Sequence, residues 1–192
     1  MKIDDLQFVK EIDLLKKIER QTLIMNGGRR ENSAEHSWHL AMSVYTYLEY
    51  CPNPLNLEKC LLLALIHDIV EIDAGDTFVY NNLSNKQAEE EKTLDRLIQM
   101  LPSKKAEEVK SLWFEYEDCK TYESQYVNAL DRFLPILANY FNDGYSWRNH
   151  KIKKSQVIER NKIKIINGLP ALWPIVEHIM ESGIDSGYLI DE

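Results

Sequence analysis

Residues 60–72 read CLLLALIHDIVEI, an apolar segment that is interrupted by a few ionisable side chains. The apolar run ends at Ile66, the pair His67 and Asp68 follows at once, and apolar residues then resume around Glu71. Such a run predicts a buried helix, where ionisable groups are costly unless a metal ion or a partner charge compensates them. The segment therefore predicts both a helical core and the place where chemistry occurs.

The length and composition indicate one compact domain, and we expect residues 1–192 to form it. The 31 acidic and 23 basic residues give a net charge of -8, which opposes binding to nucleic acid polymers or anionic membranes. The three cysteines show no C-x-x-C spacing and are expected to be reduced thiols. No signal pattern and no apolar stretch near the roughly 20 residues of a membrane span is present, so we expect a cytoplasmic protein.

Apolar residues recur at three- and four-residue steps almost throughout the chain, which is typical of helices. We therefore predict an all-α domain and expect no strand. Asn32 and Glu35 have the spacing of a capping box, which predicts a helix start at that point. The expected helices are 3–23, 33–50, 57–72, 84–101, 103–118, 123–141 and two short ones between 155 and 181, with loops at 75–77 and 144–147.

Two more ionisable residues fall on apolar helix faces. His36 lies one turn before Leu40, and Asp131 lies on the inward stripe of its own helix. Each residue alone has an ordinary explanation. His36 could be a satisfied core histidine, and Asp131 could pair with Arg132 or Arg20.

The joint occurrence of these residues favours a metal centre. The candidates offer two imidazoles and two carboxylates from different helices, and they are His36, His67, Asp68 and Asp131. Such a mixed set leaves positions for water. It suits manganese, cobalt, iron, nickel or magnesium better than a closed structural zinc site, so we expect one divalent ion.

The motifs, taken in order, resemble those of the HD-domain metal-dependent phosphohydrolases. The words ENSAEHS at 31–37, HDIVE at 67–71 and GDT at 75–77 are similar to the branch that contains the bacterial 5′-deoxynucleotidases and their eukaryotic relatives. The resemblance covers about 14–141, with the helices at 155–181 expected to pack on this core. It implies a single HD-domain helical bundle, a homodimer, that removes the 5′-phosphate from nucleoside monophosphates.

The resemblance also implies roles for single residues. It assigns the metal ligands to His36, His67, Asp68 and Asp131. Glu71 and Asp76 match the acidic groups that handle protons and position the attacking water. Helical spacing independently favours Glu71, which lies one turn beyond His67. For Asp76, an ordinary turn residue after Gly75 is the alternative.

Substrate contacts are expected from residues on both sides of the metal ligands. Arg20 matches the family's arginine near the end of the first helix, which orients the phosphate through paired hydrogen bonds. Thr77, in the GDT word, is expected to contact substrate as well. The deoxynucleotidases place an aromatic residue after the arginine, whereas this chain has Gln21. We therefore expect weaker discrimination between ribose and deoxyribose.

The favoured reaction is attack of a metal-activated water on the phosphorus of a nucleoside monophosphate. One alternative is another activity of HD-domain enzymes, such as cleavage of nucleoside triphosphates or cyclic phosphodiesters. A second is a non-catalytic nucleotide sensor that keeps the metal. A third is oxygen chemistry at two irons, which would require more inward ligands than the sequence offers. His150 and His178 lie outside the motifs and are expected at the surface or in packing.

Overall fold

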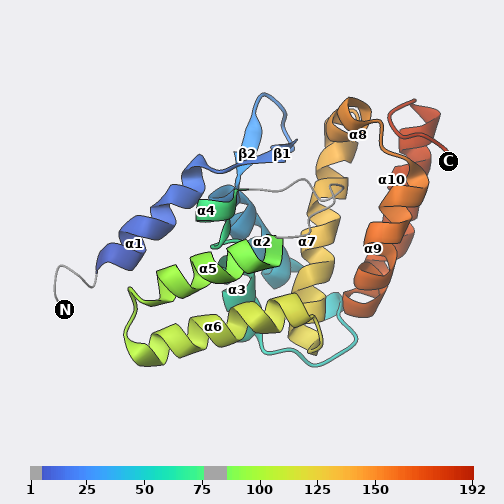
Figure 1. Cartoon of the computed structure of the whole chain (residues 1–192). Helices are drawn as coiled ribbons and strands as arrows, with labels where there is room; N and C mark the ends of the chain where they lie inside the picture. Colours follow the sequence, from blue (N-terminus) through green and yellow to red (C-terminus); the bar gives the residue numbers. More distant parts are fainter. Residues whose placement is uncertain (1–5, 76–85) are drawn as a thin grey trace.

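The structure is a computed structural model that describes residues 6–75 and 86–192. Asp76 and Thr77 lie outside the described residues, so their assigned roles stay predictions. Within the described ranges the chain is mostly helical (Figure 1), which confirms the all-α class.

The elements follow one another in the order shown in Figure 1, with 3-10 helices labelled η. The first half comprises α1 (Gln7–Ile12), η2 (Asp13–Lys17), β1 (Glu19–Leu23), β2 (Arg30–Asn32), α2 (Ser33–Tyr47), η3 (Leu48–Tyr50), α3 (Leu57–Ile66) and α4 (Glu71–Ala74). The second half comprises α5 (Lys86–Ile98), α6 (Ser103–Asp118), α7 (Tyr122–Phe141), α8 (Tyr145–His150), α9 (Lys154–Gly168), η4 (Pro170–Leu172) and α10 (Trp173–Asp185).

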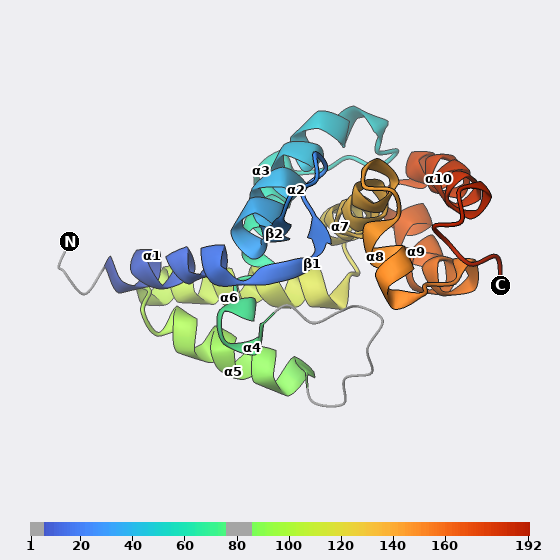
Figure 2. The same ribbon diagram turned by 90° about the horizontal axis from the view of Figure 1, so that it is seen from above.

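Helix α7 lies at the centre of the molecule. Helices α9 and α10 lie on one side of it, and α5 and α6 lie toward the opposite end of the molecule (Figures 1 and 2). In this structure the C-terminal helices α9 and α10 pack against α7. Figure 2 also shows that α2 and α3 lie side by side next to α7.

The main apolar core is formed where α2, α3 and α7 meet the C-terminal helices. Leu40, Leu63 and Leu130 are fully buried in it. The hydroxyl of Tyr126 donates a hydrogen bond of 2.9 Å to the carbonyl of Val44, which ties α7 to the last part of α2. Burial of large apolar side chains is the main source of stability in such a core.

A glycine sets how closely α9 approaches α7. A Cβ atom on Gly168 would lie 2.0 Å from the carbonyl oxygen of Gln125 and 2.8 Å from Cβ of Ala129. Neither distance is compatible with van der Waals radii. The close contact between the two helices therefore depends on glycine at this position.

The capping box that the sequence predicts at the start of α2 is confirmed. The side chain of Asn32 accepts a hydrogen bond from the Glu35 backbone N–H at 2.9 Å. The side chain of Glu35 in turn accepts from the Asn32 backbone N–H at 3.2 Å. Two backbone donors at the helix start are thus satisfied.

The predicted helix at 3–23 is wrong in its second half, and the expectation of no strand fails with it. Ile18 is extended, with φ -88° and ψ 104°, and β1 then pairs antiparallel with β2. The turn between the strands contains Gly27 and Gly28 with φ of 73° and 90°, a left-handed conformation that glycine adopts at little steric cost. In the hairpin, Arg20 and Thr22 donate hydrogen bonds to Glu31 of the partner strand. The spacing of apolar residues in the sequence does not predict this polar contact.

The predicted helix at 57–72 is interrupted where its ionisable residues begin. Helix α3 ends at Ile66, and α4 begins at Glu71. Between them, the Ile69 N–H donates to the Ile66 carbonyl at 3.1 Å and the Glu71 N–H donates to the Asp68 carbonyl at 3.0 Å. These three-residue bonds tighten the backbone into a turn. His67 and Asp68 therefore lie in a bend of the chain instead of a regular helix.

The loop expected at 144–147 is wrong as well, because residues of this stretch begin helix α8. The side-chain oxygen of Asn139 accepts hydrogen bonds from the backbone N–H groups of Ser146 at 3.0 Å and Trp147 at 3.2 Å. This side chain satisfies donors in the first turn of α8 from outside the helix. The two helices expected between 155 and 181 are confirmed as α9 and α10.

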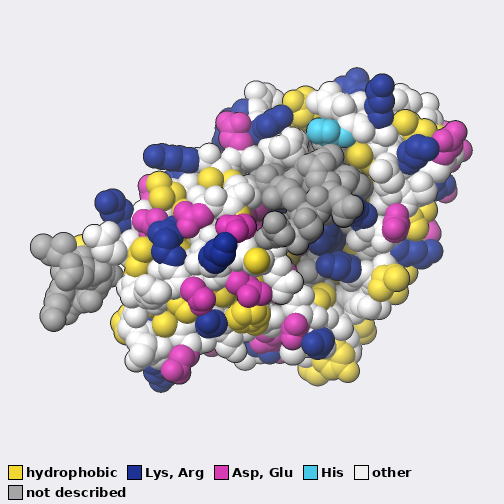
Figure 3. Space-filling model, in the orientation of Figure 1, with side chains coloured by type: hydrophobic (Ala, Val, Ile, Leu, Met, Phe, Trp, Pro, Cys, Tyr) yellow, Lys and Arg dark blue, Asp and Glu magenta, His cyan; other side chains and the backbone are white. Residues whose placement is uncertain are grey.

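The surface carries charges of both signs. On the face shown in Figure 3, Lys and Arg side chains lie among Asp and Glu side chains. Of the helices in the described ranges, none has the length and apolarity needed to cross a bilayer. The cysteines Cys51, Cys60 and Cys119 form no disulfide with one another, as expected.

Candidate metal centre

The structure brings the four expected ligand residues together. His36 comes from α2, His67 and Asp68 come from the turn between α3 and α4, and Asp131 comes from α7. Ligand atoms of His36, His67 and Asp68 all lie within 4.8 Å of one another. Asp131 Oδ1 lies 2.9 Å from His36 Nε2 and 3.9 Å from His67 Nε2.

His67 is held in the tautomer that a metal ligand needs. Its Nδ1 lies 2.9 Å from the Ala64 carbonyl oxygen, which can only accept, so Nδ1 carries the hydrogen. In the neutral ring Nε2 then has a free lone pair. This atom is buried and finds no hydrogen-bond partner among the residues that the structure describes, although Asp68 Oδ2 is 3.1 Å away. The lone pair of Nε2 and the negatively charged carboxylate oxygen repel each other. A cation beside these two atoms would remove the repulsion.

The distances in the cluster fit a divalent ion. Adjacent ligands of an octahedral ion with bonds of about 2.1 Å lie about 3 Å apart. His36 Nε2 and Asp131 Oδ1 are 2.9 Å apart, and His67 Nε2 and Asp68 Oδ2 are 3.1 Å apart. Two imidazoles and two carboxylates are also a donor set that such ions accept. The residues therefore form a candidate site for one divalent metal.

The acidic groups of the cluster are ionised. Burial raises the pKa of Asp68, but its contacts with His67 and Arg20 outweigh this effect and hold the pKa well below its usual value. The pKa of Asp131 is likewise lowered, because the contact with His36 outweighs burial. Both carboxylates are thus available as anionic ligands without an added cost of deprotonation.

His36 is fully buried, and its pKa depends on the same contacts. Burial and the charge of Arg20 lower this pKa, whereas contacts with Asp131 and Glu31 raise it, and the net result is a pKa of about 9. A metal ion at Nε2 would therefore have to displace a proton. Ion binding at Nε2 would then be coupled to proton release.

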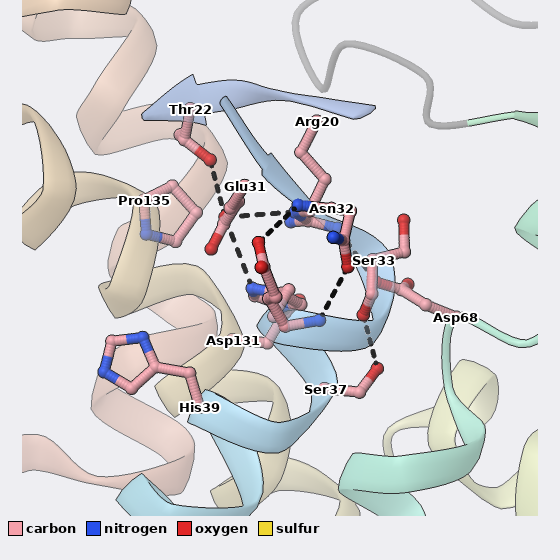
Figure 4. A network of polar contacts seen from close by, with 12 residues as sticks. Arg20, Thr22, Glu31, Asn32, Ser33, Ser37, His39, Asp68, Asp131 and Pro135 are labelled. Atoms are coloured by element: carbon pink, nitrogen blue, oxygen red, sulfur yellow. Dashed lines mark hydrogen bonds and ion pairs between the residues drawn. The ribbon is translucent and has the colours of Figure 1, made fainter. Parts of the chain in front are cut away.

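Arg20 lies at the edge of the cluster, on β1 instead of the helix that the sequence predicts. Its Nη1 donates to Asp68 Oδ2 at 2.8 Å, and its Nε donates to Glu31 Oε1 at 3.3 Å. Nη1 is also 4.0 Å from Glu71 Oε1. Figure 4 shows the Arg20 side chain reaching from the hairpin toward Glu31. The alternative considered for Asp131 was a pair with Arg132 or Arg20, and within residues 6–75 and 86–192 no such ion pair is present. Asp131 contacts His36 and Tyr116 instead.

Glu71 is buried at the start of α4, beside the cluster. Its Oε2 accepts a hydrogen bond of 2.5 Å from the hydroxyl of Ser33, at the start of α2. Ser37 donates to the Ser33 carbonyl at 2.9 Å, as Figure 4 shows. Ser33 therefore fixes one oxygen of the carboxylate, and the other oxygen lies 4.0 Å from Arg20 Nη1.

Glu31 belongs to the site, although the sequence analysis gave it no role. Its Oε1 accepts from the Thr22 hydroxyl at 2.6 Å and from Arg20 Nε, and it lies 3.6 Å from His36 Nδ1. Burial raises the pKa of Glu31, but contacts with His36, Arg20 and Thr22 reverse this effect and lower it. The sequence feature that could have identified Glu31 is its position in the segment ENSAEHS, five residues before His36.

Tyr116 is a second residue that sequence reasoning missed. Its hydroxyl donates to Asp131 Oδ2 at 2.9 Å, and its ring centroid lies 5.0 Å from that of His67. In the sequence Tyr116 is one more aromatic residue on an apolar face of α6. No local signal distinguishes it from an ordinary core residue.

A cleft of about 290 Å³ lies beside Glu31, between the hairpin, α2 and α7. Trp38, His39 and Leu134 are among the residues that line it. His39, for which the sequence supports only an ordinary packing role, is half-buried in this wall. Gln21 lies between Arg20 and Thr22 on β1 and is half-buried, and its contact with substrate stays a prediction.

Comparison with known proteins finds matches over most of the chain. A family model described as HD domain matches residues 12–173. A crystal structure of a predicted metal-dependent phosphohydrolase from Magnetospirillum magnetotacticum MS-1 superposes with a TM-score of 0.92 and 38% identity, covering 97% of this chain and 94% of that one.

Curated relatives are similar over part of their length. The 5′-deoxynucleotidase HDDC2 of Homo sapiens is 30% identical over 135 residues, which are 69% of this chain and 65% of the relative. The 5′-deoxynucleotidase hdd1 of Schizosaccharomyces pombe is 34% identical over 113 residues, which are 55% of each chain. The chain thus spans just under two thirds of the length of the human protein.

Proposed function

This chain belongs to the HD-domain family, and we propose that it is a phosphohydrolase that removes the 5′-phosphate from nucleoside or deoxynucleoside monophosphates. The observation that carries the proposal is the convergence of two imidazoles and two carboxylates beside a half-buried arginine and a buried glutamate. The names of the relatives, 5′-deoxynucleotidases, support the substrate class.

We assign one divalent ion to His36, His67, Asp68 and Asp131. Manganese, cobalt, iron, nickel and magnesium all suit this donor set. When bound, such an ion supplies Lewis acidity, which makes a coordinated water more acidic and offsets charge on phosphoryl oxygens. The hydrogen bond from His67 Nδ1 to the Ala64 carbonyl would leave the lone pair of the other ring nitrogen available to such an ion.

Arg20 and Glu71 supply the remaining chemistry from the described residues. The guanidinium of Arg20 lies 2.8 Å from Asp68, so a phosphate at this site meets a fixed, planar donor group. Glu71 is ordered by Ser33 and accepts the proton of the attacking water. We further propose that Asp76 shares in proton transfer and that Thr77 contacts the substrate.

We also propose that the protein is a cytoplasmic homodimer and that residues 1–192 form one domain. The dimer is supported by large apolar side chains that α2 exposes to solvent, namely Trp38, Met42 and Tyr45. Contiguous exposed apolar surface is typical of interaction sites. Light scattering after gel filtration measures the mass in solution, and the mass of a monomer at all concentrations would contradict the dimer.

The test of the function is a phosphate-release screen of ribo- and deoxyribonucleoside monophosphates after reconstitution with each candidate metal. We expect release with at least one metal and none after chelation. Release from triphosphates or cyclic phosphodiesters alone would favour another HD-domain activity. Metal-dependent nucleotide binding without hydrolysis would favour a sensor, and either result would overturn the proposal.

The amide side chain of Gln21 leads to a prediction about the selectivity of the enzyme for ribose or deoxyribose. An amide can donate to or accept from a 2′-hydroxyl, whereas a bulky ring would exclude it. We expect the native chain to discriminate weakly between matched ribo and deoxyribo substrates, and Gln21→Trp to favour the deoxy form in kcat/KM. A strong deoxy preference in the native chain that the substitution leaves unchanged would place selectivity elsewhere.

A further inference from the structure

We propose that Glu31 is a positioning residue that fixes the orientation and tautomer of His36 from outside the ligand set. The inference rests on the proposed metal site. It assigns a function to a carboxylate that is only 9% exposed and lies behind the ligand, away from Asp131.

Three side chains converge on one oxygen of Glu31. The Thr22 hydroxyl donates to Oε1 at 2.6 Å, Arg20 Nε donates to it at 3.3 Å, and His36 Nδ1 lies 3.6 Å from it. Figure 4 shows Glu31 between the hairpin and the start of α2, with Thr22 and Arg20 directed at it. The same oxygen therefore contacts both the phosphate-binding arginine and a metal ligand.

The two nitrogens of the His36 ring face two different carboxylates. Nε2 lies 2.9 Å from Asp131, which we place in the ligand set, and Nδ1 faces Glu31. Nδ1 is buried, and no hydrogen bond to it is present within the described part of the chain, since 3.6 Å exceeds the usual range of about 2.7–3.2 Å. The approach of Glu31 to Nδ1 is therefore electrostatic in this structure.

An ionised carboxylate accepts hydrogen bonds and donates none. A neutral imidazole carries one hydrogen, and the partner of one nitrogen decides where it lies. With Glu31 beside Nδ1, the hydrogen is favoured on Nδ1 and the lone pair is left on Nε2, toward the other ligands. Carboxylate partners of metal-bound histidines commonly act in this way.

A purely structural role for Glu31 is the alternative to test. Thr22 and Glu31 join β1 to β2, so their contact also closes the hairpin. If this were the whole function, loss of the Glu31 charge would weaken the fold and leave the affinity of the folded protein for metal unchanged. The two roles therefore predict different results for metal affinity.

The experiment compares metal affinity by competition with a chelator, using Co²⁺ or Mn²⁺ on the full chain. Glu31→Gln keeps the size of the side chain and removes its charge. We expect its metal affinity to fall about 10- to 100-fold, the usual effect of losing such a partner. Thermal unfolding of the metal-free proteins measures the structural contribution separately.

Two control variants make the comparison specific. Thr22→Val removes a hydroxyl that bonds Glu31 and leaves the carboxylate in place, so it should lower stability and leave metal affinity close to native. Glu35→Gln removes a carboxylate that pairs with Arg29 at the surface, 2.6 Å away, and should also leave the affinity close to native.

The inference is overturned if Glu31→Gln binds the ion as tightly as the native protein. It is also overturned if Thr22→Val weakens binding as much as Glu31→Gln does. If Glu31→Gln does not fold, Glu31→Asp retains the charge but withdraws it from Nδ1, and native affinity in that variant would contradict the role. A native protein that binds metal but hydrolyses no monophosphate would refute the proposed function alone.

Discussion

The two halves of helix α2 lie in different environments. The first half buries Ser33, His36 and Ser37 in the polar cluster, and the second half buries Leu40 and Val44 in the apolar core. Hydrogen bonds and ion contacts are directional, whereas apolar packing is not. We conclude that one helix can carry a chemical site and a packing surface without a break, and that substitutions in the two regions should have separable effects.

The largest expected effect is on the polar side, from His67→Ala. Removing this imidazole should lower metal content and reduce turnover to the background rate. That loss is larger than the about 10²- to 10⁴-fold that one general acid or base contributes. Elemental analysis and a phosphate-release assay measure it, with circular dichroism to confirm the fold. Full metal content and full activity in both His67→Ala and Asp131→Ala would refute the site.

The next effect separates catalysis from metal binding within the polar region. Glu71→Gln should keep the metal and lower kcat about 10²- to 10⁴-fold, because a proton acceptor beside the ligands is lost. The matched control is Asp73→Asn, which alters an acid on the same short helix that pairs with Arg96 at the surface. An unchanged kcat in Glu71→Gln would remove Glu71 from the mechanism.

The apolar half of α2 should give the opposite result. Leu40 is fully buried, and Leu40→Ala should lower the free energy of unfolding by about 2–5 kcal/mol. Urea denaturation measures this loss, and metal bound per folded molecule should stay near native. Leu65→Ala, at a leucine of α3 that is 48% exposed, is the matched control. A large loss of metal affinity in folded Leu40→Ala would show that the two regions are coupled.

The smallest expected effect concerns one hydrogen bond between α7 and α2. Tyr126→Phe removes the donor to the Val44 carbonyl and should cost about 0.5–1.5 kcal/mol of stability. Differential scanning calorimetry resolves a change of this size. The exposed residue Tyr122, also on α7, supplies the control, Tyr122→Phe, which should be close to neutral. Equal losses from both variants would contradict the assigned role of the bond.

Helical periodicity predicted the packing elements well. Helix α6 has the predicted bounds, and α7 begins one residue earlier than expected. These helices bury one continuous apolar stripe each, and spacing along the chain records such a stripe directly. The same logic placed His36 and Asp131 on inward faces, and the structure brings them to within 2.9 Å.

The spacing of apolar residues did not predict the backbone conformation where polar contacts with residues distant in the sequence accompany it. The strand at Glu19–Leu23 depends on contacts of Arg20 and Thr22 with Glu31, and the bend after Ile66 accompanies the bond from His67 to Ala64. Tyr116 reaches Asp131 only after α6 and α7 have packed. Such contacts depend on three-dimensional proximity, so no local sequence pattern predicts them.

The glycine between α9 and α7 has a consequence for mutational tolerance. Any side chain at Gly168 must displace the backbone carbonyl of Gln125, in the first turn of the helix that also carries Asp131. In a library of single variants we expect position 168 to accept almost no replacement, as strictly as a residue of the site itself. A screen for lost activity would then select this remote position together with the chemical groups. Only a separate measurement of folded protein would tell the two classes apart.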